Sequence, residues 1–386
     1  MMNIGIIDAD LMGNKKHRFP NLASMKISSY YKSLGNTVQL VLSYDDITNY
    51  DKVFISKVFT ETTIPEHVLT LPNVTYGGTG FFYDKAAPLP DEIEHCMPDY
   101  HLYDEWMTLA IENGVKESEL KYYKDYSIGF TTRGCIRGCS FCVNQHYKQC
   151  VIHSPLSEFL DENRKYICLL DDNILACKDW KVIFNELNTT GKRFQFKQGM
   201  DERLLTDEKC EVIFNSNWHG EYIFAFDNIK DKDIIEKKLA LIKKHTHVIP
   251  KFYTFCAYNH NNIGVYDEEF WVQDITDLFE RIRILISYGC LPYVMRYKDY
   301  ELSPYNRIYI YAAAWCNQPS FFKSMTFTEY CKVKGMSKGC FKKYGMDFDE
   351  YLKDGGAKGA PWRSCEAFAE KYPEIANKYF HIKWST

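Results

Sequence analysis

The chain is best interpreted from one stretch, Arg133-Gly134-Cys135-Ile136-Arg137-Gly138-Cys139-Ser140-Phe141-Cys142. Its three thiols are spaced C-x3-C-x2-C, its two glycines let the backbone curl, and an aromatic residue precedes the last thiol. This pattern indicates a loop wrapped around an inorganic cluster, with a zinc site as the main alternative. Structural zinc usually takes four ligands, commonly from two C-x2-C pairs, and the sequence has no second pair. Three thiolates would leave the fourth iron of a cubane open.

This stretch resembles the signature of the radical S-adenosylmethionine (SAM) superfamily, including an aromatic residue, here Phe141, beside the third cysteine. The resemblance implies that Cys135, Cys139 and Cys142 hold three irons of a 4Fe-4S cluster, while SAM chelates the fourth. It further implies an enzyme that reductively cleaves SAM to a 5′-deoxyadenosyl radical, which abstracts hydrogen from a substrate. A reductant such as flavodoxin or ferredoxin is then an expected partner. In such enzymes the cofactor carries the hard chemistry, and the protein positions it.

The composition is that of an ordinary globular protein. The 386 residues suffice for two or three domains; 46% are hydrophobic, 25% are charged, and the net charge is −4. This charge does not support a nucleic-acid partner. No apolar run approaches a membrane span, and the first residues lack the features of a secretory signal. We therefore expect a cytoplasmic protein without a membrane partner, in which the fourteen cysteines serve metal binding, catalysis or packing.

Strands alternate with helices in residues 1–83, which predicts a small, parallel, doubly wound domain. The expected strands are 3–10, 37–43, 52–59 and 74–78, and the expected helices are 21–34 and 65–69. Residues 84–125 are rich in proline at first and then helical, and we expect them to form a connector.

The opening resembles the Rossmann-like, cobalamin-binding-type domain that precedes the barrel in one branch of radical SAM enzymes. The resemblance rests on the strand-helix-strand start, on residues 34–38 (Leu-Gly-Asn-Thr-Val), and on Tyr76-Gly77-Gly78 followed by residues 89–92 (Leu-Pro-Asp-Glu). That branch often carries an Asp-x-His-x-x-Gly motif whose histidine ligates cobalt. The motif is absent, and His17 lies in a basic loop typical of a solvated histidine. Cobalamin stays a candidate cofactor, but the missing motif argues against it.

Residues 126–300 contain six predicted strand-helix units, which fit the open, partial (β/α)6 barrel of the superfamily. The expected strands are 126–132, 166–170, 193–197, 221–226, 248–256 and 291–296, and the helices are 157–165, 180–187, 207–215, 232–245 and 268–288. A mainly helical extension is expected over 301–386. Chemistry in such barrels gathers at the carboxyl ends of the strands.

Polar residues follow the second and third strands. The second ends in Asp171, Asp172 and Asn173, where related enzymes place oxygens that receive the ammonium group of SAM. A helix N-cap at Asp172 or Asn173 is the alternative. After the third strand, Gln198 and Arg203 are candidates to bind the carboxylate of SAM or the substrate, unless Arg203 pairs with its neighbour Asp201.

The fourth and fifth strands supply the remaining candidates. The resemblance implies that Asp227 accepts hydrogen bonds from the SAM ribose. Cys256 and Tyr258 are candidate catalytic residues that deliver a hydrogen atom to a substrate radical, with packing of a buried cysteine as the alternative.

The sequence leaves the substrate and a second class of function open. The substrate is interpreted only as a small metabolite, a peptide or a nucleotide. The C-terminal cysteines match no cluster motif and are interpreted as structural; they are Cys316, Cys331, Cys340 and Cys365. The alternative function is a non-catalytic iron-sulfur or zinc-binding module, which would bind metal but not SAM.

Overall fold

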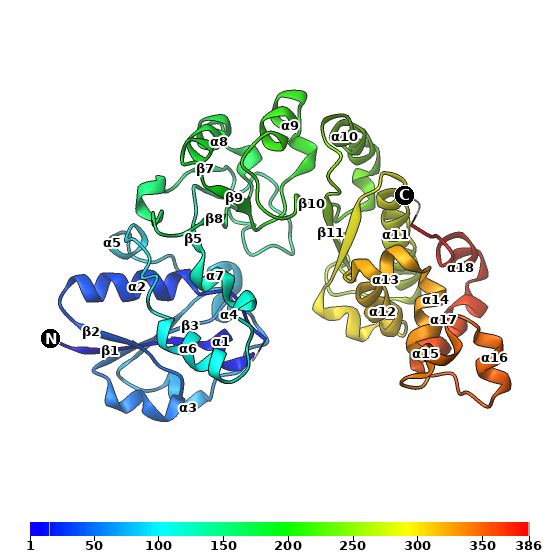
Figure 1. Cartoon of the computed structure of the whole chain (residues 1–386), viewed down its shortest axis with the longest axis horizontal. Coiled ribbons are helices and arrows are strands. Elements are labelled where there is room, and N and C mark those ends of the chain that lie inside the picture. Colours follow the sequence, from blue (N-terminus) through cyan, green and yellow to red (C-terminus); the bar gives the residue numbers. More distant parts are fainter. Residues whose placement is uncertain (15, 385–386) are drawn as a thin grey trace. The chain divides into compact units, whose positions relative to one another are not determined.

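The computed structural model describes residues 1–14 and 16–384 and has a mixed α/β fold with parallel sheets (Figure 1). It divides into two compact units. The first comprises Met1–Gln198 and Ser216–His219, and the second comprises Gly199–Asn215 and Gly220–Thr386. Within the described residues, no helix is both long and apolar enough to cross a membrane.

The first unit begins with a four-stranded parallel sheet in the order β2-β1-β3-β4. Alternate residues of β1 enter different cores: Ile6 packs with helix α2, while Ile7 packs with Val68 of helix α3. Helices α2 and α3 lie on opposite faces of the sheet (Figure 1). Burial on both faces explains the apolar strand sequences and agrees with the predicted doubly wound layer. The elements are β1 (Asn3–Asp8), α1 (Ala9–Gly13), α2 (Leu22–Ser33), β2 (Thr37–Leu40), β3 (Lys52–Ser56), α3 (Glu66–Leu69), β4 (Val74–Gly77) and α4 (Thr79–Phe82).

A second sheet of the first unit contains three of the six strands predicted for the barrel, in the parallel order β5-β8-β9. Helix α8 covers it, because the ring of Phe184 packs on Phe194 and Phe196 at 5.8 and 5.5 Å between centroids. The connector before this sheet contains short helices. The elements are α5 (Asp91–Glu94), α6 (Asp104–Glu112), α7 (Lys121–Lys124), β5 (Tyr126–Gly129), β8 (Tyr166–Leu169), α8 (Trp180–Thr189) and β9 (Arg193–Phe196).

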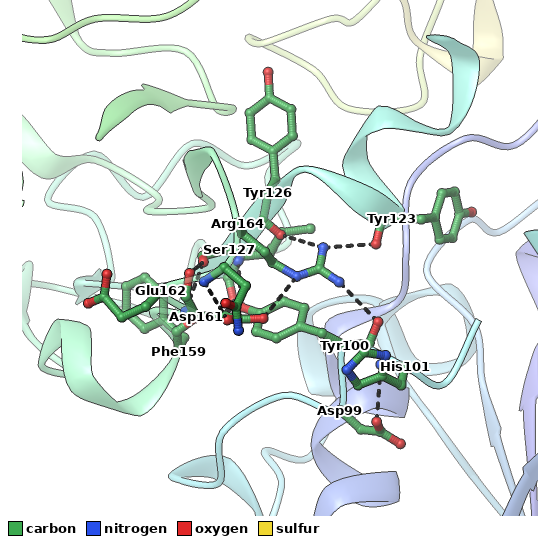
Figure 2. Close-up of polar contacts among 12 residues, drawn as sticks. Asp99, Tyr100, His101, Tyr123, Tyr126, Ser127, Phe159, Asp161, Glu162 and Arg164 are labelled. Carbon is green, nitrogen blue, oxygen red and sulfur yellow. Dashed lines mark hydrogen bonds and ion pairs between the residues drawn. The ribbon is translucent and has the colours of Figure 1, made fainter. Parts of the chain in front are cut away.

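The helix predicted over 157–165 is wrong. Only Leu156–Glu158 forms a single 3-10 turn, and Arg164 explains why the rest is irregular. Its buried guanidinium donates to the carbonyl oxygens of Tyr100 (3.0 Å), Tyr123 (2.8 Å) and Tyr126 (3.1 Å), as Figure 2 shows. These bonds hold the segment against the connector and the start of β5, which a continuous helix would prevent.

The second unit contains the other three strands in the parallel order β10-β11-β12. Helix α11 packs against this sheet and shares one core with the C-terminal helices, since Phe279 lies 5.0 Å from Phe327 and 4.8 Å from Phe380 between ring centroids. The elements are α9 (Asp207–Phe214), β10 (Ile223–Ala225), α10 (Lys232–His245), β11 (Lys251–Cys256), α11 (Glu268–Ser287), β12 (Leu291–Arg296), α12 (Asn306–Cys316), α13 (Pro319–Ser324), α14 (Phe327–Gly335), α15 (Cys340–Tyr344), α16 (Phe348–Lys353), α17 (Ala360–Lys371) and α18 (Pro373–Tyr379).

Candidate functional site

The three cysteines of the C-x3-C-x2-C motif lie on a loop, residues 134–150, which we call the cysteine loop. An antiparallel ribbon closes it, in which β6 (Thr132–Arg133) pairs with β7 (Val151–Ile152). Gly134 is required at its mouth, because its φ is +96° and an added Cβ would lie 2.2 Å from the carbonyl oxygen of Gln149. The motif therefore begins where only glycine lets the two chain segments approach.

Asp171 fixes the strand end from which the loop departs. Its buried carboxylate accepts the backbone N–H groups of Thr131 (3.0 Å) and Thr132 (2.7 Å), and both threonine hydroxyls also donate to it. Burial raises the pKa of Asp171 to about 6, although the four donors oppose this shift. Both oxygens are thus used within the fold, and they join the end of β5 to the end of β8.

Asp172 holds the cysteine loop at two points. One carboxylate oxygen accepts the N–H of Gly134 at 2.7 Å, and the other accepts the amide of Asn144 at 2.6 Å. Gly134 precedes the first cysteine of the motif, and Asn144 follows the last. Burial raises the pKa of Asp172, while the Gly134 N–H and the charge of Arg133 oppose the shift. A single side chain thereby sets the spacing of the loop ends.

Asn173 contacts the first cysteine and also presents an unsatisfied acceptor. Its Nδ2 donates to Cys135 Sγ at 3.3 Å, whereas its Oδ1 is buried without a hydrogen-bond partner among the described residues. A buried acceptor without a donor costs about 1–3 kcal/mol, so this oxygen is suited to receive a donor from a bound ligand.

Basic residues and a main-chain N–H donor occur along the cysteine loop. No Asp or Glu occurs from residue 126 to residue 157, whereas Arg133, Arg137 and Lys148 do. The backbone N–H of Asn144 also points to Cys142 Sγ at 3.4 Å. The three cysteines are half-exposed, and none of the fourteen cysteines forms a disulfide within the described residues.

No group of three His, Cys, Asp or Glu side chains in the described residues is gathered closely enough to hold a single metal ion.

Phe141 and Gln198 complete the predicted positions in the first unit. The carbonyl oxygen of Phe141 accepts the hydroxyl of Tyr83, and Gln198 is exposed after β9.

At the carboxyl edge of the N-terminal sheet, the side chain of Asp10 binds the loop that follows β3. Strand order reverses between β1 and β3, where doubly wound sheets take ligands. There the Asp10 carboxylate accepts the N–H groups of Val58 (2.7 Å) and Phe59 (3.3 Å) and the hydroxyl of Thr62 (2.6 Å). His17 lies beside Phe59, with ring centroids 6.0 Å apart. These bonds join the loop after β3 to the segment after β1, at the position where such sheets take ligands.

In the second unit, Arg203 is engaged in ion pairs. Its guanidinium lies 2.7 Å from both Asp201 Oδ1 and Asp231 Oδ2, so the alternative of a pair with Asp201 is present in the structure. Glu202 lies between Asp201 and Arg203 in sequence. It is buried and accepts the N–H of Ala225 at 3.0 Å through one carboxylate oxygen. Its other oxygen has no partner among the described residues, and burial with the nearby Asp201 charge raises the pKa of Glu202 to about 8.

Asp227 is held by a residue that the sequence analysis missed. Arg281 of α11 is buried and donates to the carbonyl oxygens of Phe226 (3.0 Å), Asp227 (2.8 Å) and Phe255 (2.8 Å), and Asp227 Oδ1 accepts the N–H of Phe255 at 3.1 Å. Burial raises the pKa of Asp227 to about 6, against the charge of Arg281. In the sequence, the only signal for Arg281 was a basic residue on the otherwise apolar face of a long helix.

The two predicted hydrogen-atom donors occupy different surroundings. Cys256 belongs to the core that the sheet shares with α11 and α12, and its Sγ lies 3.5 Å from the carbonyl oxygen of Met295. Tyr258 is also buried, within an aromatic group in which its ring centroid lies 4.9 Å from Tyr297 and 5.0 Å from His260. The surroundings of Cys256 favour a packing role, whereas those of Tyr258 do not decide between packing and catalysis.

No protein-family model matches the chain. The chain is similar to solved structures of SAM radical enzymes that bind cobalamin. One is the radical S-adenosylmethionine methyltransferase TsrM from Kitasatospora setae, with cobalamin and a [4Fe-4S] cluster bound, at a TM-score of 0.49 and 11% identity over 76% of this chain and 74% of TsrM. Another is the cobalamin-dependent SAM radical enzyme OxsB. Its TM-score is 0.43 and its sequence identity is 11%, over 80% of this chain and 55% of OxsB. At such values the likenesses do not define a family for this chain.

Proposed function

We propose that the chain is a radical SAM enzyme whose cluster is held by Cys135, Cys139 and Cys142. Asn173 carries the proposal, because it contacts the thiol of Cys135 and keeps a buried acceptor oxygen unsatisfied on the same side chain. A ligand beside the cluster that donates hydrogen bonds, such as an ammonium group, would satisfy this oxygen. The donor set fits the cofactor, since cysteine thiolates are the usual ligands of iron-sulfur clusters and none of the three cysteines is in a disulfide.

The residues of this chain would divide the work of holding the cofactor. Asp171 fixes the start of the cysteine loop, Asp172 fixes its ends, and Asn173 offers the free oxygen. When bound, the reduced cluster and SAM supply a carbon radical that abstracts hydrogen from a substrate. Further contacts to SAM are proposed for Phe141, Gln198, Arg203 and Asp227, and hydrogen-atom delivery for Cys256 or Tyr258.

The proposal includes an architecture and partners. The six parallel strands would form one partial (β/α)6 barrel over 126–300, after a Rossmann-like domain (1–83) and a connector (84–125), and before the helical extension (301–386). The substrate is a small molecule or a peptide, and a flavodoxin or a ferredoxin supplies the electron in the cytoplasm.

The test is electron paramagnetic resonance of the anaerobically reconstituted and reduced protein, with and without SAM. We expect a 4Fe-4S signal that SAM changes. Asn173→Ala should keep the cluster but weaken SAM binding about 10- to 100-fold, since one hydrogen bond to a charged group is lost. Cys96→Ala, which removes a half-exposed thiol outside the loop, is the matched control. It should change neither the cluster signal nor the affinity for SAM. A cluster whose signal SAM leaves unchanged, or a protein that binds zinc and shows no cluster signal, would support the non-catalytic module instead.

A further inference from the structure

The turn that follows helix α4 contacts the cysteine loop on both sides of Cys142. The hydroxyl of Tyr83 donates to the carbonyl oxygen of Phe141, the residue before Cys142. The amide of Gln145 donates to Asp84 Oδ2 at 2.8 Å, three positions after Cys142. These partners are separated by 58 and 61 positions along the chain, so the contacts connect the N-terminal layer to the motif.

The backbone of Tyr83 adopts a conformation that favours glycine. Its φ is +50° and its ψ is −117°, at the carboxyl end of α4. Tyr83 and Ala257 are the two non-glycine residues with positive φ among those described. Such a conformation is costly for a side chain with a Cβ, and it persists only where the surroundings impose it. Tyrosine at this position therefore points to a use for its side chain.

The N-terminal layer makes this turn a firm support. Gly78 starts α4 with φ +109°, and an added Cβ would lie 2.3 Å from the carbonyl oxygen of Lys57, which also accepts the N–H of Gly80 at 3.0 Å. The ring of Tyr76 stacks on Phe82, with centroids 5.9 Å apart and planes 10° apart. The end of β3 thus fixes α4 before the chain reaches Tyr83.

The contacts from this turn complement those of Asp172. Asp172 fixes Gly134 before the first cysteine and Asn144 after the last. Tyr83 and Asp84 add bonds at Phe141 and Gln145, on either side of Cys142 in the middle of the loop. The carbonyl that Tyr83 holds belongs to the peptide that leads directly into Cys142. A change at Tyr83 is therefore transmitted to one thiol of the motif.

We propose that Tyr83 and Asp84 are positioning residues that hold Cys142 in place through the backbone of the cysteine loop. The N-terminal layer then serves as a brace for the motif. The hydrogen bonds from Tyr83 and Asp84 hold the loop whether or not a cluster is bound. Their effect on the retention of a cluster rests on the proposed function.

The test compares variants by hydrogen exchange of the metal-free protein and by the rate at which a chelator removes iron from the reconstituted protein. Tyr83→Phe removes only the hydroxyl, and Asp84→Ala removes the acceptor for Gln145. We expect each to raise amide exchange over residues 141–145 and the rate of iron loss about 2- to 10-fold, the effect of one hydrogen bond. Asp84→Asn keeps an acceptor oxygen and should restore protection.

Two controls separate positioning from general stability. Tyr76 is as exposed as Tyr83, at 39%, and its hydroxyl makes no bond to the cysteine loop among the described residues. Tyr76→Phe should therefore change neither amide exchange over residues 141–145 nor the rate of iron loss. Tyr83→Gly relieves the backbone conformation and should leave the unfolding temperature close to that of the wild type while residues 141–145 lose protection.

Equal exchange over residues 141–145 in Tyr83→Phe, Asp84→Ala and the wild type would overturn the proposal. So would a loss of protection in Tyr83→Gly that is spread evenly over the first unit, because that outcome indicates a structural role. If the wild type binds no iron but exchange at 141–145 still depends on Tyr83 and Asp84, the proposed function fails and the brace stands.

Discussion

Asp172 and Asn173 show how a short polar segment can build most of a site. They are adjacent in sequence, so their side chains leave the backbone in different directions; Asp172 contacts the ends of the cysteine loop, and Asn173 contacts the thiol of Cys135. A helix cap, the alternative considered from the sequence, would not use both side chains in this way. At the scale of single residues, the cysteine loop is held by hydrogen bonds from both main-chain and side-chain donors.

Glu202 makes the stability of the protein depend on pH. Its pKa is about 8 in the folded protein and near 4.5 in the unfolded chain. Between these values the folded state retains a proton that the unfolded state has lost, so stability falls as the pH rises from about 4.5 to about 8 and then levels off. Glu202→Gln resembles the protonated form and keeps an oxygen for Ala225, and it should not show this fall.

Urea unfolding at pH 5.5 and pH 8.5 checks this prediction. We expect the variant to be more stable than the wild type by about 1 kcal/mol at pH 5.5, and this difference to grow by roughly 2–4 kcal/mol at pH 8.5. An equal difference at both pH values would show that Glu202 does not hold its proton in the folded state.

At the scale of elements, strands and helices with a clear period were predictable, and irregular segments were not. The bounds of α10 and β12 match the sequence prediction to the residue, because each has one apolar face or a short apolar run between polar ends. The segment 157–165 has the same amphipathic pattern but is not helical. Its conformation depends on Arg164 reaching the carbonyl oxygens of Tyr100 and Tyr126, which are 64 and 38 positions away. Local periodicity contains no information about such partners.

The same limit applies to the site. That the polar residues after β8 lie beside the cysteine loop was predictable, because the ends of parallel strands meet at one edge of a sheet. The contact from Tyr83 to the cysteine loop was not, since it joins elements 58 positions apart through a backbone carbonyl. Arg281 was missed for the same reason, because three carbonyl oxygens from other elements define its role.

Arg281 fastens helix α11 to the ends of β10 and β11, and we predict a large cost when it is removed. Arg281→Met leaves three carbonyl oxygens without this donor and takes the larger of two stabilising positive charges away from the buried carboxylate of Asp227. We expect the free energy of unfolding to fall by about 3–5 kcal/mol. The matched control is Arg283→Met on the same helix, which breaks a half-exposed pair with Glu280 (2.7 Å) and should cost less than about 1 kcal/mol. Equal effects of the two substitutions in denaturant titrations would contradict this role.

At the scale of the whole molecule, the C-terminal helices are part of the second unit's core rather than an appendage to it. Rings of Phe327 and Phe380 pack on Phe279 of α11, and Trp315 and Tyr330 belong to the same core. A chain ending at residue 300 would expose that face of α11 to water. We expect such a chain to lose the cooperative unfolding of the second unit.

Limited proteolysis with mass spectrometry checks this prediction, and the first unit provides the internal control. In the truncated chain, cleavage should appear within α11, while β1 to β4 stay as resistant as in the full chain. Protection of α11 without residues 301–386 would show that the sheet and α11 form a stable core alone.

The central claim is that the cysteine loop supports SAM chemistry, and the formation of 5′-deoxyadenosine tests it most directly. The protein is reconstituted anaerobically with iron and sulfide, reduced with dithionite in the presence of SAM, and analysed by chromatography. We predict 5′-deoxyadenosine with the wild type and with Cys96→Ala, and none with Cys135→Ala. A wild-type protein that holds its cluster but forms no 5′-deoxyadenosine, and whose cluster signal does not respond to SAM, would contradict the claim.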